Sequence, residues 1–393
     1  MVLMGIDVGN TNMKCVILTR NGGVLNLVRR ASVLNTQTPG GKTYIDGERL
    51  FKAVVKMCEE AWSTIEQEKL RGIAVTSVGC APVILNKYDQ QLNDSTPNQK
   101  IEPMPHLSNE EYREICGYSK DYGCGIHNIL HFVSGVTDPL TVMSVGDYLN
   151  YRFTGIKKRE RSTAGSVTLL DRRTYDDWYD FMYEHRLNKE LFPPLCNSGD
   201  YIGDLSNPEG TKLPVGTPVF AGGQDYLCAA FAAGCTDDGD MINVLGTYEM
   251  LASFYKTPPE APESPAFVTF SDKHVFPGRY AVTTEMLADG TRADQVRKST
   301  KMYLYQEQFI EEKTSYKTKI VGGGSTNRIL IQSKAFMTGM RLYVPNIPEA
   351  TATGAALLAG VGAGVFKTYE AASRLYRHVK TEIYFPEQKR LTS

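Results

Sequence analysis

No apolar run in this sequence approaches the roughly 18 residues that a membrane-spanning helix needs. An excess of basic residues is also lacking, because 43 Lys and Arg stand against 44 Asp and Glu, which gives a net charge of −1. Nucleic-acid binders and membrane-surface binders both rely on such an excess. We therefore expect neither a nucleic acid nor a membrane among the partners. The N-terminal "MVLMGIDVGN" reaches glycine and aspartate too early for a signal peptide.

Cysteine is present but lacks the spacing of a redox or zinc motif. No two cysteines form a CxxC pair, and several lie inside apolar runs; their positions are 15, 58, 80, 116, 124, 196, 228 and 235. We interpret them as reduced, mostly buried thiols, and we expect a cytoplasmic protein.

Three nucleotide or metal motifs are also missing. No G-x-G-x-x-G follows a strand and opens a helix, which argues against a Rossmann oxidoreductase. "GGKT" at residues 40–43 resembles the end of a P-loop, but Thr36 stands where the first glycine is needed. His127 and His131 have the i,i+4 spacing of a helical metal site, yet they lack both the intervening glutamate and a third ligand. We do not expect a metal there.

The remaining patterns predict two α/β domains, which the length of 393 residues can accommodate. In the first half, "VLMGIDV" and "MKCVILT" flank "GNTN" as a hairpin, and a helix over 48–70, a buried strand over 70–79 and a helix over 143–155 follow. The pattern restarts near Pro214 with the strand "TPVFAGG", the helix "DYLCAAFAAG", two strands joined at Gly246 and Thr247, and the strand "YAVTTEML". We place the boundary at about residue 217, which gives domains over 1–217 and 218–393.

Four glycine loops recur along the chain, each after a predicted strand. They start at Gly9, Gly222, Gly246 and Gly322, and Asp7 and Asp225 lie beside the first two. Glycine lets the backbone approach a ligand and point successive N–H groups at it, as a polyphosphate requires. Any single loop could simply close a hairpin, but four loops with two carboxylates favour a phosphate site.

These stretches together resemble the FGGY family of carbohydrate kinases, within the actin-like ATPase superfamily. "GIDVGNTNMK" resembles the first phosphate loop of that family, "DYLNYRFTG" its DYL–LTG segment, and "AGGQD" its G-x-x-D catalytic motif. "GGGSTNRILIQ" followed by "EATATGAALLAGVGAGVF" resembles the C-terminal signature and is the most specific match. The similarity extends in order from about residue 1 to 370.

The resemblance implies two ribonuclease-H-like α/β domains flanking a cleft, and ATP-dependent phosphorylation of a hydroxyl on a sugar, ketose or polyol. Asp225 would be the general base, and Asp7 would hold Mg²⁺ through water. The N-terminal domain would carry the sugar side and the C-terminal domain the nucleotide side. The residues implied to bind the nucleotide are Asn10, Thr11, Asn12, Lys14, Gly246, Thr247, Gly323, Gly324 and Asn327. Asp225 could also cap the helix that follows it, since one aspartate can do both. We leave open whether the protein forms a homodimer.

The sequence departs from the family pattern in two regions. Only about thirty residues separate "YAVTTEML" from "TKIVGGG", and the C-terminal extension is short, so the second domain is expected to be shortened. Val78, Gly79, Cys80 and Ala81 stand where the family often has polar sugar contacts. Either the sugar pocket is unusual or activity is reduced. The alternative to an active kinase is therefore a catalytically weakened paralogue that binds nucleotide or sugar as a regulator.

Overall fold

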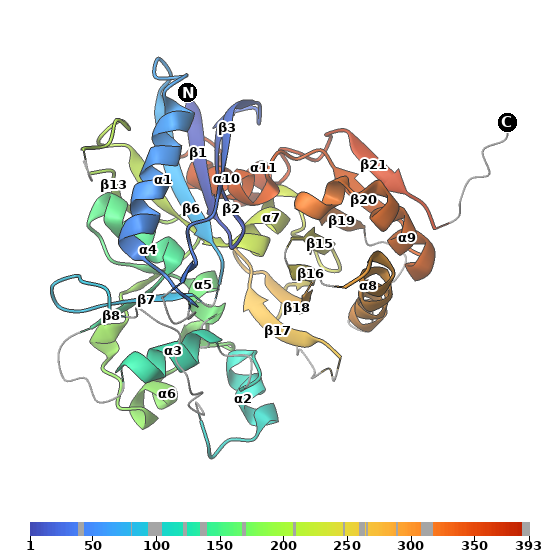
Figure 1. Cartoon of the computed structure of the whole chain (residues 1–393), viewed down its shortest axis with the longest axis horizontal. Coiled ribbons are helices and arrows are strands. Elements are labelled where there is room, and N and C mark those ends of the chain that lie inside the picture. The colour runs from blue at the N-terminus through green and yellow to red at the C-terminus, as the bar shows by residue number, and fades with distance from the viewer. Residues whose placement is uncertain are drawn as a thin grey trace.

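The computed structural model describes residues 1–37, 43–79, 81–92, 104–120, 124–133, 140–166, 170–206, 210–246, 248–258, 264, 266–287, 290–307 and 317–386. Figure 1 shows one large sheet in each half of the molecule, with helices α7 (Asp225–Ala232) and α10 (Ala350–Gly362) between the two sheets. The predicted pair of sheet-containing α/β domains is confirmed.

The first sheet has a mixed topology. Its strands follow the spatial order β13 (Tyr201–Asp204), β14 (Pro218–Gln224), β6 (Leu70–Ser77), β1 (Val2–Val8), β2 (Asn12–Thr19) and β3 (Val24–Ala31). β1, β2 and β3 pair as an antiparallel meander, whereas β6 and β14 run parallel to β1. The predicted hairpin across residues 9–12 and the strand over 70–79 are both confirmed.

The second sheet repeats this topology. Its strands follow the order β17 (Val268–Lys273), β18 (Tyr280–Leu287), β16 (Tyr248–Tyr255), β15 (Met241–Leu245), β19 (Thr318–Val321), β20 (Leu342–Pro345) and β21 (Thr381–Tyr384). β15, β16 and β18 form the antiparallel meander, β19 and β20 run parallel to β15, and β21 is antiparallel to β20. Apart from the extra edge strand β17, each strand has a counterpart in the first sheet, as two ribonuclease-H-like domains require.

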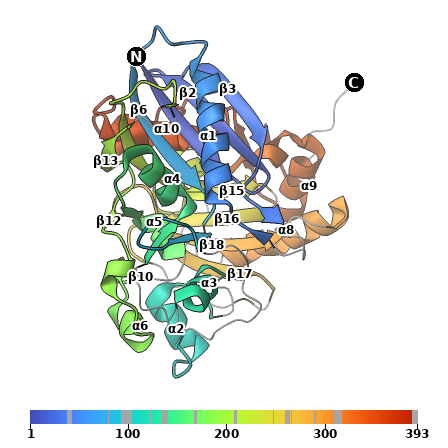
Figure 2. The ribbon, with the colours of Figure 1, turned by 60° about the vertical axis from the view of Figure 1, so that its left-hand side comes forward.

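Amphipathic helices cover the outer faces of both sheets. Asp46 is the N-cap residue of α1 (Gly47–Trp62), and its carboxylate accepts a hydrogen bond from the backbone N–H of Arg49 at 2.9 Å. Its apolar side packs on β2 and β3 beside α4 (Val145–Thr154), which ends at Gly155 with a φ of 75°. Figure 2 shows α1 in front of the first sheet. α8 (Arg292–Gln306) and α9 (Arg328–Thr338) pack together on the second sheet.

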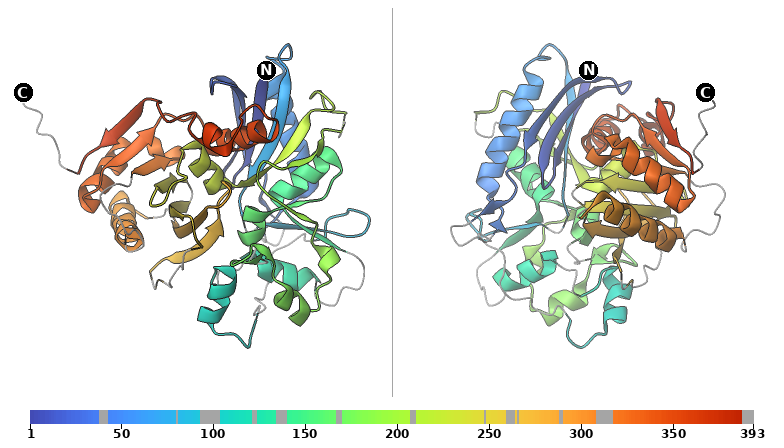
Figure 3. Two further views of the ribbon diagram at one scale, coloured as in Figure 1. Left: turned by 180° about the vertical axis from the view of Figure 1, so that it is seen from behind. Right: turned by 45° about the vertical axis from the view of Figure 1, so that its right-hand side comes forward.

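α10 returns from the C-terminal half of the chain to the inner face of the first sheet. It contacts β1, β6 and β14 and crosses α7, and the left panel of Figure 3 shows it lying across this sheet from behind. The approach is close because glycines line it: a Cβ on Gly5 would lie 1.9 Å from the carbonyl oxygen of Ala352, and one on Gly354 would lie 1.9 Å from that of Cys228. The helices α7 and α10 therefore lie packed against each other between the two sheets.

A smaller helical region lies below the first sheet in Figure 1 and connects β6 to β14. Its elements are β7 (Pro82–Leu85), α2 (Asn109–Cys116), α3 (Cys124–Val133), β8 (Thr141–Ser144), β9 (Arg159–Glu160), α5 (Arg161–Ser166), β10 (Leu170–Asp171), β11 (Asp176–Asp177), α6 (Tyr179–Glu184) and β12 (Leu195–Cys196). It touches the second sheet, since the backbone N–H of Ser271 donates to the carbonyl of Gly117 at 3.0 Å. The two short strands β4 (Thr36–Gln37) and β5 (Thr43–Tyr44) precede α1.

The predicted boundary at residue 217 falls directly before a strand of the first sheet. β14 begins at Pro218 and pairs with β6, so a cut at 217 would remove this strand from the first sheet. We propose a division after α7 instead, with α10 returning to the first domain.

Two further sequence expectations concern the thiols and the membrane. Cys15, Cys58, Cys116, Cys196, Cys228 and Cys235 are free and buried, as predicted for these positions. Within the ranges that the structure describes, no helix has the length and apolar character to cross a membrane. Residues 38–42 of the "GGKT" region lie outside the described residues.

Candidate active site

Three parallel strands of the first sheet bring their carboxyl ends to the same edge. In the β1–β6 register Asp7 lies beside Thr76, and in the β6–β14 register Gln224 lies beside Ser77. Asp225 follows directly as the first residue of α7. Ligands of open α/β sheets bind in the crevice outside the carboxyl ends of the strands. The two carboxylates that the sequence singled out therefore belong to one edge.

Asp225 combines partial burial with an acidic neighbourhood. Its side chain is half-buried, and Oδ1 accepts a hydrogen bond from the backbone N–H of Tyr226 at 2.7 Å. Burial raises its pKa to about 7; the charge of Asp7 also raises it, whereas Lys14 lowers it. A carboxylate with a pKa near neutrality is suited to accept a proton. The N-cap position of α7 is Gln224 rather than Asp225, so the capping role considered for Asp225 is not the one observed.

Asp7 forms a buried ion pair with Lys14. Lys14 Nζ lies 2.8 Å from Asp7 Oδ2 and 3.6 Å from Glu349 Oε2, and Arg29 pairs with the other oxygen of Glu349. Glu349 precedes α10 in a left-handed conformation with a φ of 39°, which is unfavourable for a residue with a side chain. Burial raises the pKa of Asp7, and Lys14 partly offsets that effect. This charge network ties the first hairpin to the start of α10.

The turn of the first hairpin is exposed at the same edge. Asn10, Thr11 and Asn12 are all exposed, and the backbone N–H of Gly9 donates to the carbonyl of Asn12 at 3.1 Å. Asn10 Oδ1 accepts from Asn35 at 3.4 Å. The predicted phosphate-binding residues of this loop thus lie together around the Asp7–Lys14 pair.

The two glycine loops of the second domain also lie together. β15 and β19 pair in parallel with Val244 beside Val321, so the turn at Gly246 adjoins the loop that follows β19. Gly322 has a φ of 94°, and a Cβ there would lie 2.5 Å from the carbonyl oxygen of Leu245. Gly323 and Gly324 begin the 3₁₀ helix η4 (Gly323–Thr326).

Asn327 ends this loop and caps α9, since its Oδ1 accepts from the backbone N–H of Leu330 at 3.2 Å. A helix N-terminus is a favourable place for a phosphate. Thr247, predicted to reach the γ-phosphate, lies outside the described residues.

Buried hydrogen bonds fix the backbone in front of Asp225. Ser162 Oγ donates to Glu160 at 2.6 Å and accepts from the backbone N–H of Gln224 at 3.0 Å. Thr76 Oγ1 donates to the carbonyl of Gly223 at 2.7 Å. Glu160 and Ser162 were not predicted from the sequence, because a short polar segment after a helix gives no periodic signal.

Another buried carboxylate joins the helical region to the second sheet. Asp272 on β17 accepts hydrogen bonds from the hydroxyls of Tyr118 and Tyr226, the latter at 2.8 Å. Burial raises its pKa to about 7. Both tyrosines are almost fully buried, so this cluster holds α7 and the segment after α2 against β17. Asp272 was not predicted from the sequence either, although an aspartate within the strand "VTFSDK" was a visible signal.

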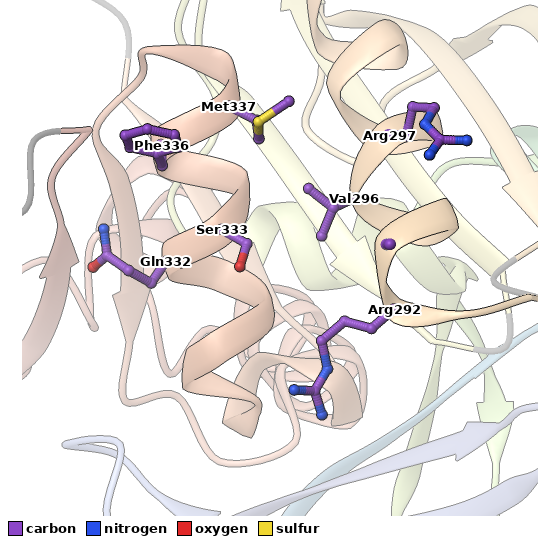
Figure 4. Close-up of a pocket in the computed structure, with 8 residues that line it drawn as sticks. Arg292, Val296, Arg297, Gln332, Ser333, Phe336 and Met337 are labelled. Atoms are coloured by element: carbon purple, nitrogen blue, oxygen red, sulfur yellow. The ribbon is translucent and has the colours of Figure 1, made fainter.

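A groove of about 650 Å³ is lined by residues of the packed helices α8 and α9. Figure 4 shows its lining, which comprises Arg292, Ala293, Val296 and Arg297 from α8 and Gln332, Ser333, Phe336 and Met337 from α9. Phe336 and Met337 are more than half exposed. α9 follows the glycine loop at 322–327, and the residues of α9 that line the groove begin at Gln332. Its volume lies within the usual range for small-molecule sites.

The site also fits a magnesium ion held largely by non-protein ligands. Asp7 and Asp225 provide carboxylate oxygens, which Mg²⁺ prefers. Among the described residues no group of three or more His, Cys, Asp or Glu side chains could hold a metal. Mg²⁺ usually keeps several waters and binds one or two carboxylates together with substrate phosphates. The chemistry of this edge matches that pattern rather than a protein cage.

Comparison with known proteins gives a consistent result. Models of the FGGY family of carbohydrate kinases match the chain twice, the N-terminal domain at residues 2–113 and the C-terminal domain at residues 306–363. L-fuculokinase of Escherichia coli (strain K12) is 22% identical over 466 aligned positions, which cover 98% of this chain and 97% of that protein. The alignment is longer than the 393 residues of this chain, so that relative contains segments absent here.

Solved structures share the fold. Xylulose kinase from Rhodospirillum rubrum superposes with a TM-score of 0.80 at 18% identity, and Plasmodium falciparum glycerol kinase with ADP with a TM-score of 0.85 at 11% identity. Each comparison covers 98% of this chain and 94% of the other.

Proposed function

Because the chain belongs to the FGGY family of carbohydrate kinases, whose members are phosphotransferases, we propose that it transfers the γ-phosphoryl group of ATP to a hydroxyl of a sugar, ketose or polyol, with Asp225 as the general base. Small-molecule acceptors are typical of such relatives, among them the L-fuculokinase described above.

The observation that carries the proposal is the position of Asp225. It lies at the carboxyl edge of the first sheet, on a backbone held by Ser162 and at the same edge as the exposed turn of the first hairpin. Phosphoryl transfer needs positioning, charge neutralisation and a base on the attacking hydroxyl. Asp225 would accept the hydroxyl proton on its carboxylate as the oxygen attacks phosphorus, and its raised pKa makes it a better acceptor than an ordinary aspartate.

The glycine loops would bind the nucleotide from both domains. Backbone N–H groups and side chains around Asn10, Thr11 and Asn12 would face the phosphates from the first domain, and Lys14 would add positive charge. From the second domain the turn at Gly246 and Thr247 would reach the γ-phosphate, while Gly323, Gly324 and Asn327 would contact the rest of the nucleotide. The groove between α8 and α9, the helix that follows that loop, would take the nucleoside.

Asp7 would hold Mg²⁺, in part through water, and a bound ion would neutralise phosphate charge during transfer. The hydrogen-bonded Lys14 lowers the pKa of Asp7 and so opposes the effect of burial, which favours the ionised carboxylate that a cation needs.

The test is an ADP-release screen with Mg-ATP over pentuloses, hexuloses and short polyols, including L-fuculose, xylulose and glycerol. We expect acceptor-dependent ADP release that Asp225→Asn abolishes. Absence of release with every acceptor, from a protein that binds Mg-ATP, would reject the active-kinase proposal.

That negative result would favour the second candidate, a weakened paralogue with a regulatory role. The observation behind it is the length difference, since the L-fuculokinase alignment contains segments that this chain lacks. Between β18 and β19 the described residues contain α8 as the only helix. That the second domain is shortened there remains a prediction.

A further inference from the structure

We infer that Gln224 is the residue that selects the acceptor, by hydrogen-bonding a hydroxyl next to the one that is phosphorylated. This inference rests on the proposed kinase activity and names the class of acceptor: an uncharged compound with two adjacent hydroxyls.

The side chain of Gln224 is buried without a partner for its amide oxygen. The residue ends β14, immediately before Asp225, and only 5% of its surface is exposed. Oε1 has no hydrogen-bond partner in the structure. A buried polar atom without a partner is rare and costly, so such an atom beside the proposed base points to a ligand.

The structural role of Gln224 is carried by its backbone and not by its amide. Its backbone N–H donates to Ser162 Oγ at 3.0 Å. Although Gln224 is the N-cap residue of α7, its side chain makes no capping hydrogen bond. The amide is therefore available for another purpose.

A glycine lies beside the amide. A Cβ placed on Gly79 would lie 2.8 Å from Gln224 Nε2 and 2.8 Å from Ser166 Oγ. Gly79 follows the carboxyl end of β6, the strand next to β14. The glycine leaves this space to the side chain of Gln224. The amide thus reaches the acceptor side of the site from β14, and this explains how a chain with few polar groups after β6 could still recognise a polyol.

The charges nearby favour a neutral acceptor. Among the charged groups that act on Asp225, Asp7 and Glu285 are acidic, and Lys14 is paired with Asp7. An amide offers one acceptor and two donors, which suits a hydroxyl and carries no charge of its own. An anionic sugar acid would meet these carboxylates at close range, so we expect gluconate to be a poor acceptor.

The test compares each acceptor with its analogue that lacks the neighbouring hydroxyl; for glycerol this analogue is 1,3-propanediol. Wild-type protein should prefer the hydroxylated acceptor roughly 10- to 100-fold in kcat/KM. Gln224→Met keeps the length of the side chain but removes the amide, and it should lose most of this preference. Mg-ATP binding should not change.

Gln306→Met is the control, because its amide bonds Ser253 and Thr284 inside the second domain. It should lower thermal stability and leave acceptor preference intact.

The inference and the proposed function fail in different ways. Turnover by the wild type with an unchanged preference in Gln224→Met, or gluconate as the best acceptor, would overturn the inference alone. No turnover with any acceptor would overturn the kinase proposal. In that case xylulose and glycerol are titrated by calorimetry, and either equal affinity for wild type and Gln224→Met or no binding to the wild type overturns the inference too.

Discussion

Lys14 and Asp7 face each other across the first hairpin, with Nζ 2.8 Å from Oδ2, at the base of the exposed turn that resembles a phosphate loop. The pair is buried on the carboxylate side and half-buried on the lysine side. It places a positive and a negative group at the same point, one suited to phosphate and the other to a cation.

Asp7→Ala should remove the part of ATP affinity that depends on Mg²⁺. The carboxylate would help to hold the ion beside the phosphates, so its loss leaves Mg-ATP and free ATP with similar affinities. Calorimetric titration of ATP with and without Mg²⁺ measures the difference. Asp176→Ala, which removes an aspartate that pairs with Arg161 at the surface, serves as the control. A Mg²⁺ effect as large in Asp7→Ala as in the wild type would contradict the assignment.

Asp225→Asn should lower kcat by ~10²–10⁴ with Mg-ATP binding nearly unchanged, because the amide keeps the shape of the carboxylate but cannot accept the proton. Steady-state kinetics on a confirmed acceptor, together with a nucleotide titration, separate the two effects. Near-normal turnover in the variant would mean that another group is the base.

The raised pKa of Asp225 predicts a pH dependence of both activity and stability. As the base must be ionised, kcat/KM should fall about tenfold per pH unit below a pKa of about 7. The folded state binds this proton more tightly than the unfolded state, whose pKa is near 3.8. Its contribution to stability is therefore lost as pH rises from about 4 to about 7. The Asp225→Asn variant has no carboxyl group to titrate, so its stability does not fall in this way. The free energy of unfolding of the variant, measured relative to the wild type with denaturant, should therefore increase over that pH range. A pH-independent difference would show that Asp225 titrates normally.

The sequence predicts the candidate site best at the ends of the strands. Asp7 and Asp225 stand out because each follows an apolar run and precedes or accompanies a glycine loop, and the structure brings both to one sheet edge. The doubling of the fold was visible as two strand–turn–strand units, at residues 9–12 and 246–247.

Other features depend on contacts between distant segments, which a local pattern does not contain. Glu160 supports Gln224 through Ser162, and Asp272 binds tyrosines that lie far away in the sequence. The domain boundary depends on such a distant contact as well. β14 looks like the start of a new half in the sequence, but its hydrogen-bond partner is β6.

Gly354→Ala tests the helix crossing under the site. The added Cβ would lie 1.9 Å from the carbonyl oxygen of Cys228, so α10 and α7 would have to move apart. Overpacking of this kind costs about 1–3 kcal/mol, measured as a lower free energy of unfolding in denaturant. Gly23→Ala is the control, since the one atom of the described residues near its added Cβ would be Thr19 Oγ1 at 3.2 Å. Equal stability of the two variants would argue against close packing at Gly354.

The α8–α9 groove predicts weak selection between purine bases. If the nucleotide is held mainly by its phosphates, those charge-assisted contacts do not distinguish ATP from GTP. The apolar lining of the groove is largely exposed, with Phe336 at 63%, so it can stack on either base. We expect dissociation constants for Mg-ATP and Mg-GTP that differ little and that both rise with salt, because exposed charge contacts are screened.

Phe336→Ala should weaken both nucleotides about fivefold, the low end of stacking energies of ~1–3 kcal/mol. Ile329→Ala is the matched control, because Ile329 lies on the same helix and is 62% exposed but does not line the groove. Titrations of both nucleotides with both variants at low and moderate salt test the groove and the phosphate loops separately. Strong ATP preference that survives salt would require an adenine pocket that reads the base, and the prediction of weak selection between the bases would then be wrong. An equal effect of Phe336→Ala and Ile329→Ala would instead place the nucleoside outside this groove.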